Sequence, residues 1–169
     1  MAQKKKVTAT IVMDELLYDI MNETFLRGRT IQNDENYKEV ANMFASQDEE
    51  NQDKIIRSIK RHFSEVKTEL GEYLDENGLT TDNKLISAEQ DLVLELVMPS
   101  NFNEAATAGV AESIHAYIVS ATVGDWYLVT NKNDADAYVG LAQTALESIR
   151  KSVSKRSRPM RRAAAGNNP

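Results

Sequence analysis

Apolar residues recur every three or four positions in the middle of the chain, and this spacing constrains the fold most. Ile59, Phe63, Val66, Leu70 and Tyr73 follow one another at intervals of four, three, four and three. Such intervals place these side chains on one face of a helix, which must pack against another helix to leave water. The repeat is too short for a free coiled coil, so the sequence predicts a helical bundle.

The helix that carries this repeat is predicted over residues 48–76. Ser46 can cap its start, and the acidic residues of its first turn suit the positive end of the helix dipole. Asn77-Gly78 provides an expected left-handed exit. Gly28 is expected to end an earlier helix, and a short turn is expected to join the last two helices as an antiparallel hairpin. The other predicted helices are 13–27, a short one near 37–44, 101–129 and 134–154.

One segment changes period and reads as a strand. Residues 91–98 form a nearly continuous apolar run that is rich in valine and is closed by Pro99. A single strand cannot satisfy its own backbone, so its partner is either the β-prone segment Lys6–Met13 or a strand of another subunit. The predicted fold class is mainly α: a helical bundle with a short β-strand or hairpin element and an extended C-terminal arm. The predicted core is Leu17, Ile20, Ile59, Phe63, Val66, Leu70, Ile114, Ile118, Trp126, Leu141, Ala145 and Ile149.

Charge is strongly segregated along the 169 residues. The net charge is −6, but all 26 acidic residues lie within 7–149, together with only ten of the 20 cations. That stretch therefore carries −16, while the two ends together carry +10. A body this negative repels DNA over most of its surface, whereas the ends can hold an anionic partner or the acidic body of a neighbouring copy.

The C-terminal end is the clearest candidate for partner binding. We predict a helical domain over 1–153 and a basic, flexible arm over 154–169, because the arm has little apolar content and Pro159 opposes helix continuation. A solubilising tail is the alternative interpretation. The candidate partner-binding residues are Arg150, Lys151, Lys155, Arg156, Arg158, Pro159, Arg161 and Arg162.

No catalytic, cofactor-binding or metal-binding residues are predicted. Cysteine is absent, which excludes disulfides and thiolate metal sites. His62 and His115 are interpreted as structural, because neither is linked by a motif to a nucleophile or an orienting carboxylate. The acidic residues around Gly78 fail the calcium-loop template, which requires Glu where Lys84 stands. No apolar run reaches the length of a membrane span, and Asp14 and Glu15 argue against a signal peptide.

The lone tryptophan is interpreted as part of a junction between the last two helices. Asp125, Trp126 and Tyr138 are the predicted junction anchors, since aromatic residues contribute large buried areas at such corners. A base-stacking role for Trp126 would need cations beside it, and the local sequence offers Asp125 and a single Lys132.

The stretch from His115 to Arg162 resembles small head-to-tail connector proteins of tailed bacteriophages, particularly those of crAss-like and related Bacteroidales phages. An Asp-Trp pair is followed by a Thr-Asn-Lys turn, a helix that opens on Asp-Ala and a tyrosine, and a basic end. These elements correspond to Asp125-Trp126, Thr130-Asn131-Lys132, Asp134-Ala135, Tyr138, Arg158-Pro159 and Arg161-Arg162. The resemblance covers about a third of the chain in detail and the rest by helix order.

The resemblance implies a structural virion protein rather than an enzyme. Such connectors are mainly helical subunits that form a homo-oligomeric ring, commonly dodecameric, below the portal protein. The ring joins capsid to tail, touches further neck or tail proteins, and extends the channel for DNA without reading its sequence. It would be located at the head-tail junction of the virion, after assembly in the host cytoplasm, with no membrane or cofactor.

Two other function classes remain open at the level of sequence. A small cytosolic helical regulator could use its basic tail to bind nucleic acid, with an affinity that depends strongly on salt. An enzyme would instead show a deep pocket with titratable residues of perturbed pKa.

Overall fold

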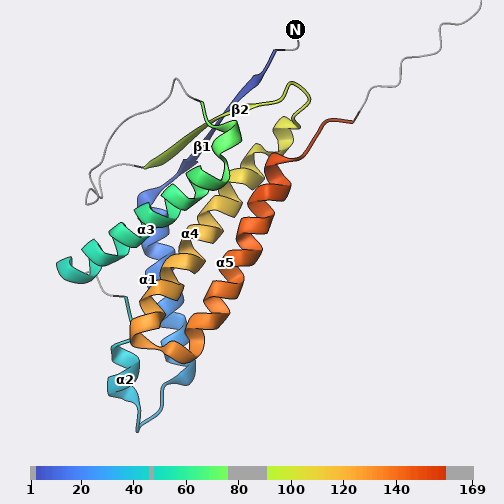
Figure 1. Cartoon of the computed structure of the whole chain (residues 1–169). Coiled ribbons are helices and arrows are strands. Elements are labelled where there is room, and N and C mark those ends of the chain that lie inside the picture. Colours follow the sequence, from blue (N-terminus) through green and yellow to red (C-terminus); the bar gives the residue numbers. More distant parts are fainter. Residues whose placement is uncertain (1–2, 46–47, 76–90, 159–169) are drawn as a thin grey trace, which may run out of the picture.

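The computed structural model describes residues 3–45, 48–75 and 91–158. Within them the fold is mainly α, as predicted, with a two-stranded antiparallel sheet at one end of the helices (Figure 1). The elements in chain order are β1 (Lys5–Ile11), α1 (Met13–Ile31), α2 (Tyr37–Ala41), α3 (Glu49–Glu69), the 3-10 turn η1 (Gly71–Tyr73), β2 (Leu92–Met98), the 3-10 turn η3 (Glu104–Ala106), α4 (Thr107–Thr130) and α5 (Lys132–Val153).

Helix α4 lies at the centre of the bundle. It contacts α1, α3, α5 and β1, and it runs beside α5 over most of its length (Figure 1). Its residues are apolar on nearly all sides, with Val110, Ile114, Ile118 and Val123 fully buried. A helix that is apolar all round is one that other elements surround. The predicted antiparallel pairing of the last two helices is confirmed.

The predicted strand at 91–98 is also confirmed, and its partner is the N-terminal segment of the same chain. β1 pairs with β2 in antiparallel register, from Lys5 opposite Met98 to Ile11 opposite Leu92. Both strands alternate between buried and more exposed residues, so one face of the sheet covers the helices. The carboxylate of Asp91, directly before β2, accepts a hydrogen bond from the amide of Met13 and thereby caps the start of α1.

Two predicted helix ends are wrong. Helix α3 ends at Glu69 rather than at residue 76, because the chain turns through η1 and Leu74 bridges to Leu96 of β2. The expected exit at Asn77-Gly78 lies outside the described residues. Gly28 does not end α1, which continues to Ile31. It lies where the helix meets Phe44, and a Cβ at this position would come within 2.3 Å of the Phe44 ring.

The predicted core is correct except on α5. Ten of the predicted residues are buried, Ala145 is partly buried against the core, and Leu141 is 54% exposed. The buried residues of α5 follow a stripe through Ala135, Tyr138 and Ala142, and Leu141 lies beside this stripe on the solvent side. The prediction for Leu141 is therefore wrong. The short segment near 37–44 does contain a helix, α2.

Candidate interaction site

The cations at the end of α5 are engaged within the subunit. The Arg150 guanidinium binds both carboxylate oxygens of Glu69 on α3, at 2.5 and 3.0 Å. This pair raises the pKa of Arg150 and lowers that of Glu69 through the hydrogen bonds between them. Lys151 lies 3.9 Å from Glu147, one helical turn earlier. Of the predicted partner-binding residues, Arg150 therefore has the firmest contact inside its own chain.

The first residues after α5 run beside the loop that precedes α4. The Asn103 amide donates to the Lys155 carbonyl, the Ser157 amide donates to the Asn101 carbonyl, and Arg156 forms a bridge with Phe102. Arg156 also donates to the Val153 carbonyl at the end of α5. Residues 155–157 thus belong to the folded body, although the sequence assigned them to a flexible arm.

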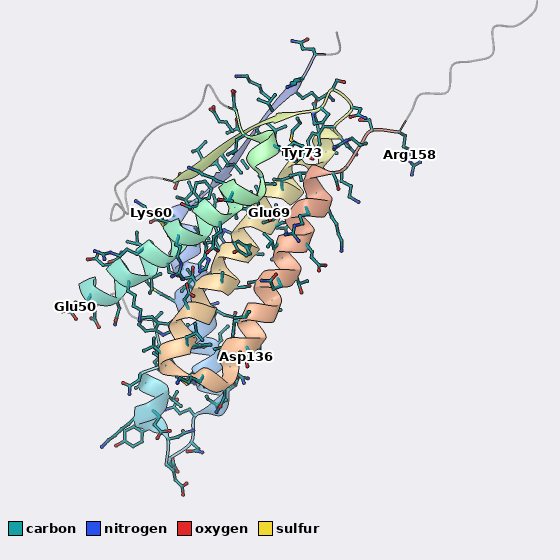
Figure 2. The ribbon with its side chains drawn as sticks, viewed as in Figure 1. Glu50, Lys60, Glu69, Tyr73, Asp136 and Arg158 are labelled. Atoms are coloured by element: carbon teal, nitrogen blue, oxygen red, sulfur yellow. The ribbon has the colours of Figure 1, made fainter. Side chains whose placement is uncertain are left out.

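Arg158 is the last residue that the structure describes. Arg158 is exposed and lies beyond the end of α5, away from the bundle (Figure 2). Pro159, Arg161 and Arg162 lie outside the described residues. Arg156 lies near the start of β1, because the carbonyl of its bridge partner Phe102 accepts a hydrogen bond from Lys5.

Asp125 and Trp126 were predicted to anchor the junction between α4 and α5. In the structure their side chains contact other elements. Asp125 faces α3, and the Trp126 indole donates to the Met43 carbonyl while Lys54 of α3 lies over its ring. Successive helical residues point about 100° apart, so neighbours in sequence face different elements. Tyr127, the next residue, makes the contact with Tyr138 of α5, edge to face at 5.3 Å.

Tyr138 belongs to a polar contact between α5 and α1. Its hydroxyl donates to Glu23 at 2.6 Å, and Arg27 of α1 binds both carboxylate oxygens of Asp134. Burial raises the pKa of Tyr127 to about 12, and the hydrogen bond from Arg27 lowers the pKa of Asp134. Tyr138 therefore contacts both α1, through Glu23, and α4, through Tyr127.

His62 is the buried member of a network of ionisable side chains between α3 and α4. Its ring contacts Asp125 through Nε2 and Glu65 through Nδ1, each at 2.7 Å. Ser58 and Arg61 also donate to Asp125, and Tyr117 donates to Glu65 at 2.7 Å. Burial alone would lower the pKa of His62, but the hydrogen bonds to the two carboxylates outweigh it and the pKa is raised. The pKa values of Asp125 and Glu65 are lowered, because the same hydrogen bonds outweigh their burial.

This network does not have the geometry of nucleophilic catalysis. A catalytic histidine needs one nitrogen free to take a proton from the nucleophile. Both nitrogens of His62 face carboxylates, and the Ser58 hydroxyl donates to Asp125 rather than to the ring. The arrangement supports the structural interpretation of His62.

A groove of about 580 Å³ lies where β1, α1 and α4 meet, and the sequence analysis did not predict it. Its apolar lining includes Ile11, Val12 and Ala111. The carboxylates of Asp14, Glu15, Asp19 and Glu112 also line it, together with Thr10, Tyr18 and His115. His115 holds Asp19 at 2.7 Å, and no lysine or arginine of the described residues lines the groove. The only signal in the sequence was the acidic start of the first helix, because the two halves of the groove are distant in the chain.

The comparisons with known proteins give no relative. No protein-family model, no curated protein and no solved structure matches this chain. Within the described ranges, no group of three or more histidine, aspartate or glutamate side chains is arranged so that it could hold a metal ion. None of the helices described is both long and apolar enough to cross a membrane.

Proposed function

We propose that this protein is a structural subunit of the neck of a tailed bacteriophage, where copies form a ring below the portal protein and join capsid to tail. The observation that carries the proposal is the separation of charge in the folded subunit. The basic C-terminal residues as far as Arg158 lie near the start of β1, and the acidic residues all belong to the stretch 7–149. A ring requires two different surfaces that complement each other between neighbours, and opposite charges provide such a pair.

The acidic body also suits a channel through which DNA passes. A strongly positive wall would bind phosphates and retain the duplex, whereas an acidic or neutral wall would not. In this proposal the basic segment binds protein, first the neighbouring copy and then the portal, and DNA moves through the ring without sequence-specific contacts. The protein is proposed to have no enzymatic activity.

The proposal is tested by the mass and shape of the purified full-length protein, alone and with its portal, by light scattering and electron microscopy. We expect closed rings, and we expect the protein at the head-tail junction of virions. Deletion of residues 159–169 is expected to abolish ring formation or attachment to the portal while the subunit stays folded. A monomer that binds DNA tightly, and loses this binding with the segment or with salt, would instead establish the nucleic-acid-binding alternative.

A further inference from the structure

We propose that the groove between β1, α1 and α4 receives the basic segment Arg158–Arg162 of the neighbouring copy. This inference rests on the proposed ring and names the contact that would close it. It commits to one occupant, because the groove and the segment complement each other in charge, in apolar content and in position.

Three of the four carboxylates of the groove have no ion-pair partner among the residues that the structure describes. Among the described residues, Asp14, Glu15 and Glu112 are exposed and form no ion pair, while Asp19 is held by His115. The segment contributes Arg158, Arg161 and Arg162, and the sequence contains no acidic residue after Glu147. Arginine suits this role because its planar guanidinium can bind a carboxylate through two hydrogen bonds.

The apolar parts also correspond. The lining of the groove contains Ile11, Val12 and Ala111 between its carboxylates. In the segment, Met160 stands between Arg158 and Arg161, so one flexible apolar side chain is flanked by cations. Methionine fits irregular apolar surfaces well because its side chain is unbranched. A segment with this order can cover the apolar lining while its arginines reach the surrounding carboxylates.

The position of the segment favours the groove of another copy over its own. Arg156, just before the segment, bridges to Phe102, whose carbonyl accepts a hydrogen bond from Lys5 at the start of β1, whereas the groove begins at Thr10, near the end of that strand. These two ends of the sheet are roughly 20 Å apart. Arg158 already points away from the bundle (Figure 2), so occupation of its own groove would require the segment to reverse and run back along the sheet. Rotation between ring neighbours removes this requirement.

The test uses cysteine cross-linking, for which the chain is suited because it contains no cysteine. Full-length protein with Met160→Cys is mixed with full-length protein with Tyr18→Cys. Tyr18 lines the groove and is 67% exposed, so a cysteine at this position is accessible from the groove. Tyr37→Cys on α2 is the matched control, since Tyr37 is 53% exposed and lies outside the groove. Oxidation during assembly is expected to link Met160→Cys to Tyr18→Cys at least about tenfold more efficiently than to Tyr37→Cys.

A charge exchange provides the second measurement. Glu15→Lys with Glu112→Lys is expected to reduce assembly about tenfold or more, and Arg161→Glu with Arg162→Glu is expected to do the same. When the two variant proteins are mixed, the substituted segment of one variant can bind the substituted groove of the other, because their charges are again opposite. Dimers that contain one subunit of each variant are therefore expected to form. This rescue distinguishes a direct contact from damage to the fold.

The outcomes separate the inference from the proposed function. Rings that form without preferential cross-linking at Tyr18→Cys would overturn the inference and leave the proposed ring intact. A chain that carries both Tyr18→Cys and Met160→Cys and cross-links to itself as a monomer would show that the segment fills its own groove, which also overturns the inference. A failure of the unmodified protein to assemble, alone or with its portal, would overturn the proposed function and the inference with it.

Discussion

Asp125, Trp126 and Tyr127 are consecutive residues, yet they contact three different parts of the molecule. Asp125 joins the His62 network on α3, Trp126 binds the Met43 carbonyl, and Tyr127 packs against Tyr138 of α5. A single turn of α4 thus ties together the elements that surround it. This is possible because α4 lies at the centre of the bundle, where α1, α3 and α5 all contact it.

The His62 network is expected to make stability depend on pH in both directions. His62 has a raised pKa when folded, so its contribution is fully present below its ordinary value of 6.5 and is lost as the pH rises through the folded value. Asp125 and Glu65 have lowered pKa values, so their contributions are present above the ordinary values of 3.8 and 4.5 and are lost on acidification. We expect maximal stability between pH 4.5 and 6.5, measured by chemical denaturation over a pH series.

The matched variant for this experiment is His62→Gln. It removes the titrating ring, so the decline in the free energy of unfolding above pH 6.5 is expected to disappear. The acid limb is expected to become smaller, because Asp125 and Glu65 lose their hydrogen bonds to the ring and keep only those from Ser58, Arg61 and Tyr117. An unchanged alkaline decline in this variant would show that another group is responsible.

At the scale of elements, close approach between segments determines which residues are tolerated. Gly28 lies inside α1, where its missing side chain leaves room for the Phe44 ring, and that ring also packs against Phe25. Gly140 lies in α5 with open space around it. The two glycines have the same helical propensity but different surroundings.

We therefore expect opposite effects from the same substitution. Gly28→Ala is expected to destabilise the protein by about 1–3 kcal/mol, because the new methyl group overlaps the Phe44 ring. Gly140→Ala is expected to stabilise it by about 0.5–1 kcal/mol, because alanine restricts the unfolded chain and favours the helix. Thermal or chemical unfolding of both variants tests this, and equal effects at the two positions would contradict the described contact.

The aspartate variants of α4 and α5 test the core. Ile118→Asp places a carboxylate at a fully buried position and is expected to cost about 4 kcal/mol or more. Leu141→Asp changes an exposed residue and is expected to alter the free energy of unfolding by about 0.5 kcal/mol or less. Circular dichroism during denaturation distinguishes them, and a severe effect of Leu141→Asp would mean that this residue is buried.

The helices and the strand were predictable because their apolar periods are local properties of the sequence. The end of α3 was not, since it depends on the pairing of Leu74 with Leu96, which lies in another element. The contacts of Trp126 escaped prediction for the same reason. The groove escaped it entirely, because residues near Thr10 and residues near Ala111 become neighbours only when β1 packs on α4. Sequence indicated the cations of the C-terminal segment but not that Arg150 binds Glu69.

At the scale of the whole molecule, the cations divide into those that hold the subunit and those available to a partner. Arg150 and Arg27 bind acids of their own chain through two hydrogen bonds each. Lys6 binds the buried Asp75 carboxylate at 2.6 Å. Arg158, in contrast, lies at the outer end of the described chain and is exposed.

This division predicts that two arginines near the C-terminus behave differently. Arg150→Gln is expected to lower the free energy of unfolding only slightly and to leave assembly unchanged, because it loses an exposed ion pair inside the subunit that water and salt already weaken. Arg158→Gln is expected to leave stability unchanged and to weaken assembly, and the wild-type assembly should also weaken with added salt. Denaturation and light scattering on the same samples measure both properties. Weakened assembly in Arg150→Gln alone would contradict the division.

The antiparallel sheet also has a consequence for folding kinetics. Its strands are roughly 80 to 90 residues apart in the chain, so closing the sheet costs loop entropy that the helices, with their local contacts, do not incur. During translation, β1 is made before the whole of α1, α2 and α3 and must wait several seconds for its partner at ordinary synthesis rates. The cap that Asp91 provides for α1 arrives at the same late stage. The sheet is therefore the part of the subunit whose formation should limit the folding rate.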